Sequence, residues 1–141
     1  ITRSKFEESP EIMITNGDIL FVKTGSTLGK SALVTGLTED ASINPQIVVM
    51  RVKNGTEKFI STILSTKSIL KQVAAVKIGG AVPTMTETEL KNFEFYQPKN
   101  DGEMRKIGEY FTKLENLITL HQRKHAELQN IKKYMLQNIF I

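Results

Sequence analysis

A short glycine-rich stretch is the first pattern in the chain whose residue types and spacing could do chemistry. Residues 25–31 read Gly-Ser-Thr-Leu-Gly-Lys-Ser and follow a short apolar run. A phosphate-binding P-loop needs four residues between its glycines, and its Lys-Ser/Thr pair opens a helix. Here three residues separate Gly25 from Gly29, and the residues after Lys30 read as strand and turn. We therefore interpret the stretch as the tip of a β-hairpin, whose amides, hydroxyls and lysine could still contact a DNA backbone.

The two histidines, His121 and His125, lie four residues apart and would share one face of a helix. This spacing suits a metal ion, but no third ligand accompanies the pair, nor a general base as in a His-Glu-x-x-His motif. We favour a structural role for His121, as a polar break in an apolar row that fixes register and partner choice. A histidine buried there would make association sensitive to pH.

The rest of the chain offers no nucleophile–base pair of the Ser-His or Cys-His kind. It has no cysteine at all and no histidine outside residues 121 and 125. A Ser-Lys pair stays open, but no spacing points to one. Without cysteine there is also no disulfide framework and no thiolate metal site. We predict that the chain is not an enzyme and binds no metal or cofactor itself.

A second loop, residues 77–84, combines a lysine with two glycines, which allow backbone geometries that are closed to other residues. Loops held on a scaffold carry most recognition, so this one is of interest together with the first. Lys67 and Lys71 could extend the same basic surface, but they read equally well as solubilising lysines on a helix. Basic and hydroxyl groups on the two loops are expected to hold DNA phosphates. The predicted DNA-binding residues are Lys23, Thr24, Ser26, Lys30, Lys77, Gly79, Gly80 and Thr84.

Short strands and helices must position these loops. Alternating or β-branched apolar residues predict strands at residues 18–23, 32–34, 47–52 and 93–96. Residues 57–76 follow helical spacing. A capped helical turn is predicted after Thr86 or Thr88, because glutamate and leucine follow.

Residues 103–141 read as one long amphipathic helix on a strict seven-residue repeat. Such a sustained repeat is typical of a coiled-coil seam, and a lone helix cannot bury a stripe of this kind. The sequence therefore implies a partner helix. The predicted seam residues are Ile107, Phe111, Leu114, Ile118, His121, Leu128, Ile131 and Met135.

Composition sets loose limits on the class of protein. The 141 residues suit one domain and an appendage, and the net charge of +4 permits nucleic-acid binding without demanding it. No apolar run approaches membrane-spanning length, and the first residues do not open a signal peptide. We predict an α+β protein with a β-rich domain at residues 1–98, incomplete at its N-terminus, and a long coiled-coil-type helix at residues 103–141. A cytoplasmic location is expected.

Several stretches together resemble the DNA-specificity subunit of type I restriction–modification systems. The closest stretch contains Leu-His-Gln-Arg-Lys at residues 120–124, within what looks like the family's helical spacer. In place of the Pro-Pro and Glu-Gln pairs common before that spacer, this chain has Gln-Pro-Lys-Asn-Asp-Gly-Glu-Met-Arg. The similar stretches are residues 16–30, 79–84, 90–95, 106–124 and 135–140.

This resemblance implies a target recognition domain followed by a spacer helix, the second half of a subunit in which two such helices pack antiparallel. It implies a non-catalytic protein of bacterial defence that reads one part of a split site in double-stranded DNA. Methylation subunits that use S-adenosylmethionine, and restriction subunits that use ATP and magnesium, would be its partners. The missing half, or a second copy of this chain, would supply the other helix.

Two other classes of function stay open from the residues alone. One is an adaptor that binds no DNA, whose helix joins a protein partner. The other is a small NTP-binding enzyme built on the glycine-rich loop.

Overall fold

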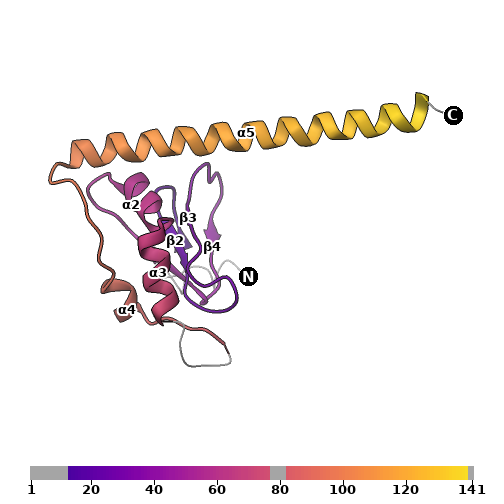
Figure 1. Cartoon of the computed structure of the whole chain (residues 1–141). Coiled ribbons are helices and arrows are strands. Elements are labelled where there is room, and N and C mark those ends of the chain that lie inside the picture. Colours follow the sequence, from indigo (N-terminus) through magenta and orange to yellow (C-terminus); the bar gives the residue numbers. More distant parts are fainter. Residues whose placement is uncertain (1–12, 77–81, 140–141) are drawn as a thin grey trace.

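A three-stranded antiparallel sheet forms the centre of the domain, and a long helix runs across one end of it (Figure 1). The computed structural model describes residues 13–76 and 82–139. Its elements are β1 (Met13–Ile14), β2 (Ile19–Val22), β3 (Ser31–Leu33), β4 (Ala41–Ser42), β5 (Ile47–Met50), α2 (Glu57–Leu64), α3 (Lys67–Val76), α4 (Glu87–Lys91) and α5 (Asp101–Ile139). The predicted α+β class and terminal long helix are confirmed.

Strand β2 lies between β3 and β5, and both neighbours run antiparallel to it. Because side chains alternate between the faces of a strand, Ile19 and Phe21 point to the same face, where both are completely buried. Helices α2 and α3 cover that face with Leu64 and Ile69. The predicted hairpin at residues 18–23 and 32–34 is confirmed by the pairing of β2 with β3.

The helical segment predicted at residues 57–76 is present as two helices, which meet at Ser65 and Thr66. The Thr66 hydroxyl donates to the Ile63 carbonyl at 2.7 Å, and the Leu70 amide donates to the Thr66 carbonyl at 3.0 Å. Hydroxyl side chains compete in this way for the carbonyls that a continuous helix would use. The chain therefore turns at this point, and α3 runs away from α5 (Figure 1).

The strand predicted at residues 93–96 is wrong, because this segment is irregular. A side chain takes the place of a neighbouring strand there. The Gln72 amide donates to the Glu94 carbonyl at 2.7 Å and accepts from the Glu94 amide at 3.0 Å. The alternation of residue types is real, but Phe93 packs on the core beside the sheet and does not extend it.

The predicted capped turn is confirmed as α4, with Thr86 as its N-cap. The Glu89 amide donates to the Thr86 hydroxyl, and the Glu89 carboxylate accepts from the Thr86 amide at 2.7 Å. The Thr86 amide and hydroxyl lower the pKa of Glu89 below its ordinary value. The capping box therefore contributes its full stability to the fold above the ordinary pKa of a glutamate. This stability is lost as the pH falls through the lowered pKa of Glu89.

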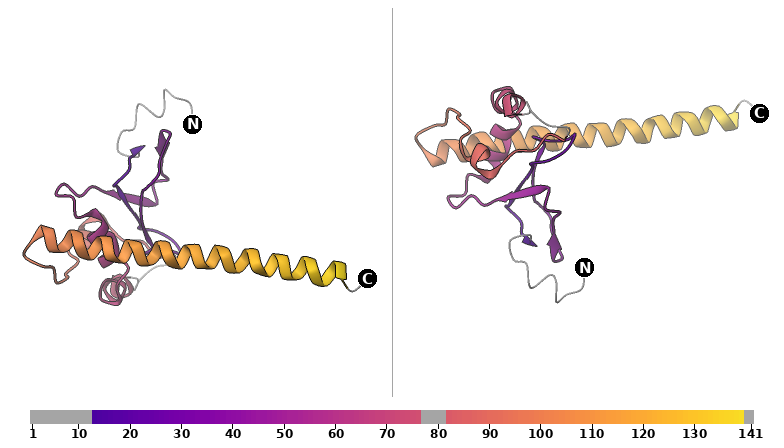
Figure 2. Two further views of the ribbon diagram at one scale, coloured as in Figure 1. Left: turned by 90° about the horizontal axis from the view of Figure 1, so that it is seen from above. Right: turned by 90° about the horizontal axis from the view of Figure 1, so that it is seen from below.

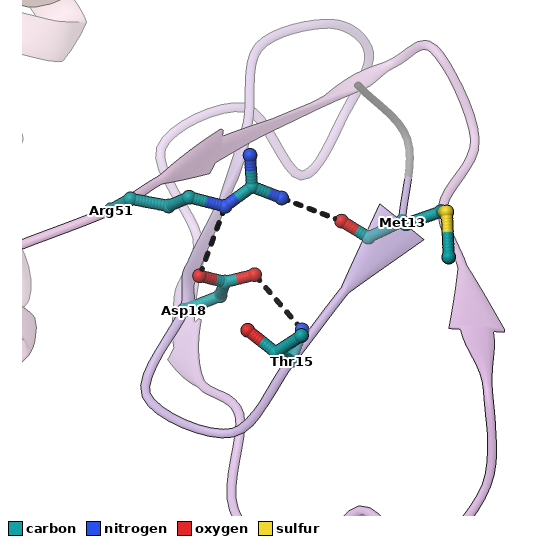
Figure 3. A network of polar contacts seen from close by, with 4 residues as sticks. All are labelled: Met13, Thr15, Asp18 and Arg51. Carbon is teal, nitrogen blue, oxygen red and sulfur yellow. Dashed lines mark hydrogen bonds and ion pairs between the residues drawn. The ribbon is translucent and has the colours of Figure 1, made fainter. Parts of the chain in front are cut away.

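Figure 3 shows how a buried carboxylate joins β1, β2 and the end of β5. The Asp18 side chain is only 6% exposed, and it forms an ion pair of 3.3 Å with Arg51, whose side chain is 52% exposed. Its second oxygen accepts from the Thr15 amide at 2.9 Å. The Arg51 guanidinium also donates to the Met13 carbonyl at 2.8 Å.

Replacing Asp18 with alanine is expected to lower the free energy of unfolding by about 1–3 kcal/mol, because the Thr15 amide loses its acceptor and Arg51 loses its partner. Chemical denaturation at fixed protein concentration measures the change. Asp40→Ala, the same replacement at an exposed position, serves as the control. Equal effects of the two changes would show that the Asp18 contacts contribute nothing.

Helix α5 packs on α2 through its first turns and then leaves the domain. Of the described residues in this helix, only Met104 and Gly108 are buried. Beyond them α5 continues past the domain, as the views from above and below also show (Figure 2). Its start at Asp101 lies two residues before the predicted one.

Candidate nucleic-acid interface and partner helix

Three segments that are far apart in the sequence meet where β2 ends. The Lys23 amide donates to the Gln46 carbonyl at 2.9 Å, and the Lys23 carbonyl accepts from the Met85 amide at 2.8 Å. Thr24 and Thr84 form an isolated antiparallel bridge. The hairpin loop, the residues before β5 and the residues before α4 therefore form one surface at this end of the sheet.

The loop at residues 24–30 has the geometry of a hairpin tip. The Gly25 amide donates to the Pro83 carbonyl at 2.9 Å, and the amides of Leu28, Gly29 and Lys30 donate to backbone carbonyls of the hairpin at 3.0–3.1 Å. A P-loop directs successive amides at phosphates and continues into a helix. Here Lys30 is followed directly by strand β3. The hairpin interpretation is therefore confirmed.

Two residues of this loop hold it against the domain. Leu28 is only 6% exposed and belongs to the hydrophobic core. Gly29 has a φ of +90°, and a Cβ at this position would lie 2.8 Å from Cγ1 of Val73 on α3. Only glycine combines this backbone conformation with so close an approach to a helix. The loop is therefore fixed before any ligand binds.

The structure brings together the predicted DNA-binding residues that it describes. Ser26, Lys30 and Thr84 are exposed, and Lys23 and Thr24 are half-buried. Lys77, Gly79 and Gly80 lie outside the described residues. Sequence reasoning did not include Asn44 and Gln46, which are exposed in the loop before β5. No local motif marks these two, because only the pairing of β2 with β5 places them beside Lys23.

The charge of this surface favours an anion. Residues 23–30, 44–46 and 82–86 contain two lysines and no carboxylate. The other side chains include hydroxyls and amides, which both donate and accept hydrogen bonds. The lysines suit a phosphate backbone, and the hydroxyl and amide side chains suit base edges beside it.

The predicted seam lies along the part of α5 that the domain does not cover. Ile107, beside the α2 contact, is half-buried, and the other predicted seam residues are exposed. Leu114, Leu117, Ile118, His121, Gln122 and His125 line a shallow apolar groove on the helix. The two histidines thus share one face, as their spacing indicated. His125 lies 3.3 Å from the Gln129 amide nitrogen through its Nε2 atom.

The described residues, 13–76 and 82–139, also bear on metal sites and membrane spans. Within these ranges no three or more histidine, cysteine, aspartate or glutamate side chains are grouped so that they could hold a metal ion. No helix of the described part of the chain is both long and apolar enough to cross a membrane.

Comparison with known families agrees with this combination of loop surface and spacer-like helix. The family model described as "Type I restriction modification DNA specificity domain" matches residues 1–130. No curated protein matched the chain. The family match covers most of the chain, both the domain and much of α5. The chain therefore belongs to the family of type I restriction–modification DNA specificity domains.

Proposed function

We propose that this chain reads one half of a bipartite site in duplex DNA with the surface at the end of β2, and that α5 joins it to a second recognition half. The observation that carries the proposal is the meeting of residues 23–30, 44–46 and 82–84 at one end of the sheet. The role of a specificity subunit in a type I restriction–modification system agrees with the family. Binding alone is the mechanism that these residues require.

Each part of the surface has a distinct task in this proposal. Lys30 and Lys23 neutralise phosphates, which supplies affinity without sequence information. Ser26, Asn44 and Gln46 are exposed polar side chains beside them and are suited to base edges in the major groove. Because Leu28 and Gly29 fix the loop, little conformational entropy is lost on binding.

Charge reversal of Lys23 and Lys30 together is expected to weaken binding to duplex DNA by roughly tenfold or more at 0.1 M salt. Each phosphate contact that is lost should also reduce the slope of log K against log salt by about 0.9. A fluorescence anisotropy titration of a labelled duplex at several salt concentrations measures both quantities.

Lys53→Glu is the matched control, because the register of β5 on β2 places it at the opposite end of the sheet. This variant is expected to retain nearly all of the affinity for duplex DNA. If both lysine reversals leave affinity and slope unchanged, the contact surface lies elsewhere. If the unaltered chain binds no duplex even at low salt, a protein adaptor becomes the better assignment.

The exposed seam of α5 supplies the proposed partner contact. A full antiparallel overlap of two copies places His121 near the two-fold axis, because it lies near the middle of Asp101–Ile139. The apolar residues seven and fourteen positions away then pair, for example Leu114 with the partner's Leu128. In the complete system the partner is the other half of the subunit, and methylation and restriction subunits dock on the assembly. We assign S-adenosylmethionine, ATP and magnesium to those subunits.

A further inference from the structure

The joint between α5 and the domain is short and is made of backbone as much as of side chains. The side-chain amide of Asn54 donates to the Asp101 carboxylate at 3.4 Å, and the Arg105 guanidinium donates to the backbone carbonyl of Asn54 at 3.2 Å. In the same two turns of α5, Met104 and Gly108 are buried. Within the described chain, α5 packs on no other helix than α2 this extensively.

Gly108 is the point of closest approach in this joint. A Cβ at this position would lie 2.5 Å from the backbone nitrogen of Phe59 and 2.8 Å from the backbone carbon of Lys58. These are backbone atoms in the first turn of α2, so no side chain can move aside to make room. Glycine inside a helix costs about 1 kcal/mol relative to alanine. Helix stability therefore does not account for this residue, whereas the contact with α2 does.

We propose that Gly108 is a positioning residue that sets the angle at which α5 carries the recognition domain, and so sets the gap between the two DNA half-sites. The second part of this inference rests on the proposed function. The seam begins beside the joint, at Ile107 and Phe111, and then turns away from it, because Leu114 follows Gly108 by six residues and lies roughly 120° around the helix axis. One face of the helix thus holds the domain while another is free for the partner helix.

The geometry converts a small change at Gly108 into a large movement of the free end. Ordinary contact begins at 3.4 Å, so a Cβ found at 2.5 Å requires about 1 Å of opening. With Met104 as the fulcrum, about 6 Å along the axis, α5 tilts by roughly 10°. Residue 130 lies about 39 Å beyond Met104 and moves by about 6–7 Å. The partner domain at the far end of a paired helix moves with it.

The absence of cysteine from the chain allows a direct measurement of this angle. Spin labels are attached at Ser68→Cys on α3 and Asn130→Cys on α5, both exposed positions. The labelled chain is diluted into unlabelled chain, so that pulsed electron resonance reports distances within one copy. Adding Gly108→Ala is expected to shift the mean distance by several ångströms. An unchanged distance in a folded variant overturns the proposal.

Two matched variants complete the test. Thr119→Ala makes a helix-favouring change on an exposed face of α5 and is expected to leave the distance unchanged. Arg105→Gln removes the hydrogen bond to Asn54 without adding bulk, and is expected to broaden the distance distribution. If Gly108→Ala does not fold, Arg105→Gln provides the test. A distance distribution that is not broadened in this variant would count against the proposal that the joint fixes the angle between α5 and the domain.

Selection of bound duplexes from a random library tests the functional consequence separately. The unaltered chain is expected to select two half-sites at one fixed gap. Gly108→Ala should select the same half-sites at a changed gap, and an unchanged gap overturns the link between joint and spacing. If the unaltered chain selects no bipartite site, the proposed function fails, while the distance measurement still judges the joint by itself.

Discussion

Replacing Ile118 with aspartate is expected to separate paired α5 helices while leaving the recognition domain folded. Ile118 is 56% exposed in the single chain and lines the apolar groove of α5. Ile118 does not belong to the hydrophobic core, so the substitution leaves the core of the domain intact. In a paired seam the new carboxylate is buried without a partner, which costs several kcal/mol. The dissociation constant of the pair should rise by at least about a hundredfold, since this corresponds to about 2.7 kcal/mol.

Sedimentation velocity across a concentration series measures this change, and circular dichroism checks that the helix content of the isolated chain is retained. Thr119→Asp is the control, because it places the same charge one residue along, roughly 100° around the helix and off the predicted seam. The two variants should therefore differ sharply in association. If Ile118→Asp associates as tightly as the unaltered chain, the groove is not the partner contact.

The same variant links the helix to DNA recognition. Two recognition domains joined through α5 bind a duplex with two half-sites more tightly than one domain does, because the second contact is made at a high effective concentration. A chain that cannot pair should bind a single half-site as before, but a second half-site on the same duplex should no longer raise its affinity. Loss of binding to the single half-site would instead show that the helix itself touches DNA. The position of His121 gives this pairing a preferred register, because a polar residue in an apolar row is best placed opposite its own copy.

The parts of the fold that were predictable from sequence are those whose signal is local. Strand β2 has its hydrophobic run, α4 has the Thr86–Glu89 capping box, and α5 has its heptads. The short strands β1 and β4 were not predicted, because two residues each carry no periodicity and form only against each other. The segment at residues 93–96 alternates like a strand, but the Gln72 side chain occupies its hydrogen-bonding groups.

The candidate site divides in the same way. Glycine, lysine and hydroxyl residues identify the hairpin loop in the sequence. Thr84 is identified because it ends the glycine-containing loop at residues 77–84. Nothing in the sequence near Gln46 indicates that its carbonyl accepts from the Lys23 amide. That contact follows from antiparallel pairing between strands separated by more than twenty residues. Residue types in the sequence thus identify the candidate loops. Which of these loops share a surface is determined by the pairing of the strands in the sheet.

Gly29→Ala is expected to lower the free energy of unfolding by roughly 2–4 kcal/mol, a large effect for the addition of one methyl group. Two causes add together. An L-residue is strained at the φ of +90°, and the new Cβ would lie 2.8 Å from Cγ1 of Val73. The loop that carries Ser26 and Lys30 must then move away from α3, so DNA affinity should fall even where the domain remains folded.

The two causes can be separated, because only one of them depends on α3. Gly36→Ala is the control for backbone strain alone, since Gly36 has a φ of +71° with nothing within 4 Å of an added Cβ. The free energy of unfolding of Gly36→Ala should fall by only about 1 kcal/mol. Val73→Ala removes the atom that Gly29→Ala would strike, although the cavity it leaves destabilises the buried site by itself.

A double-mutant cycle of Gly29→Ala with Val73→Ala, measured by chemical denaturation, then isolates the contact. The double variant should be more stable than the sum of the two single effects implies, by about 1 kcal/mol or more. If the two losses of unfolding free energy are simply additive, the loop does not press on α3. In that case contact between Gly29 and Val73 does not fix the loop. If the two effects are not additive and the double variant also regains DNA affinity, then the contact with α3 holds the recognition loop in the conformation that binds DNA.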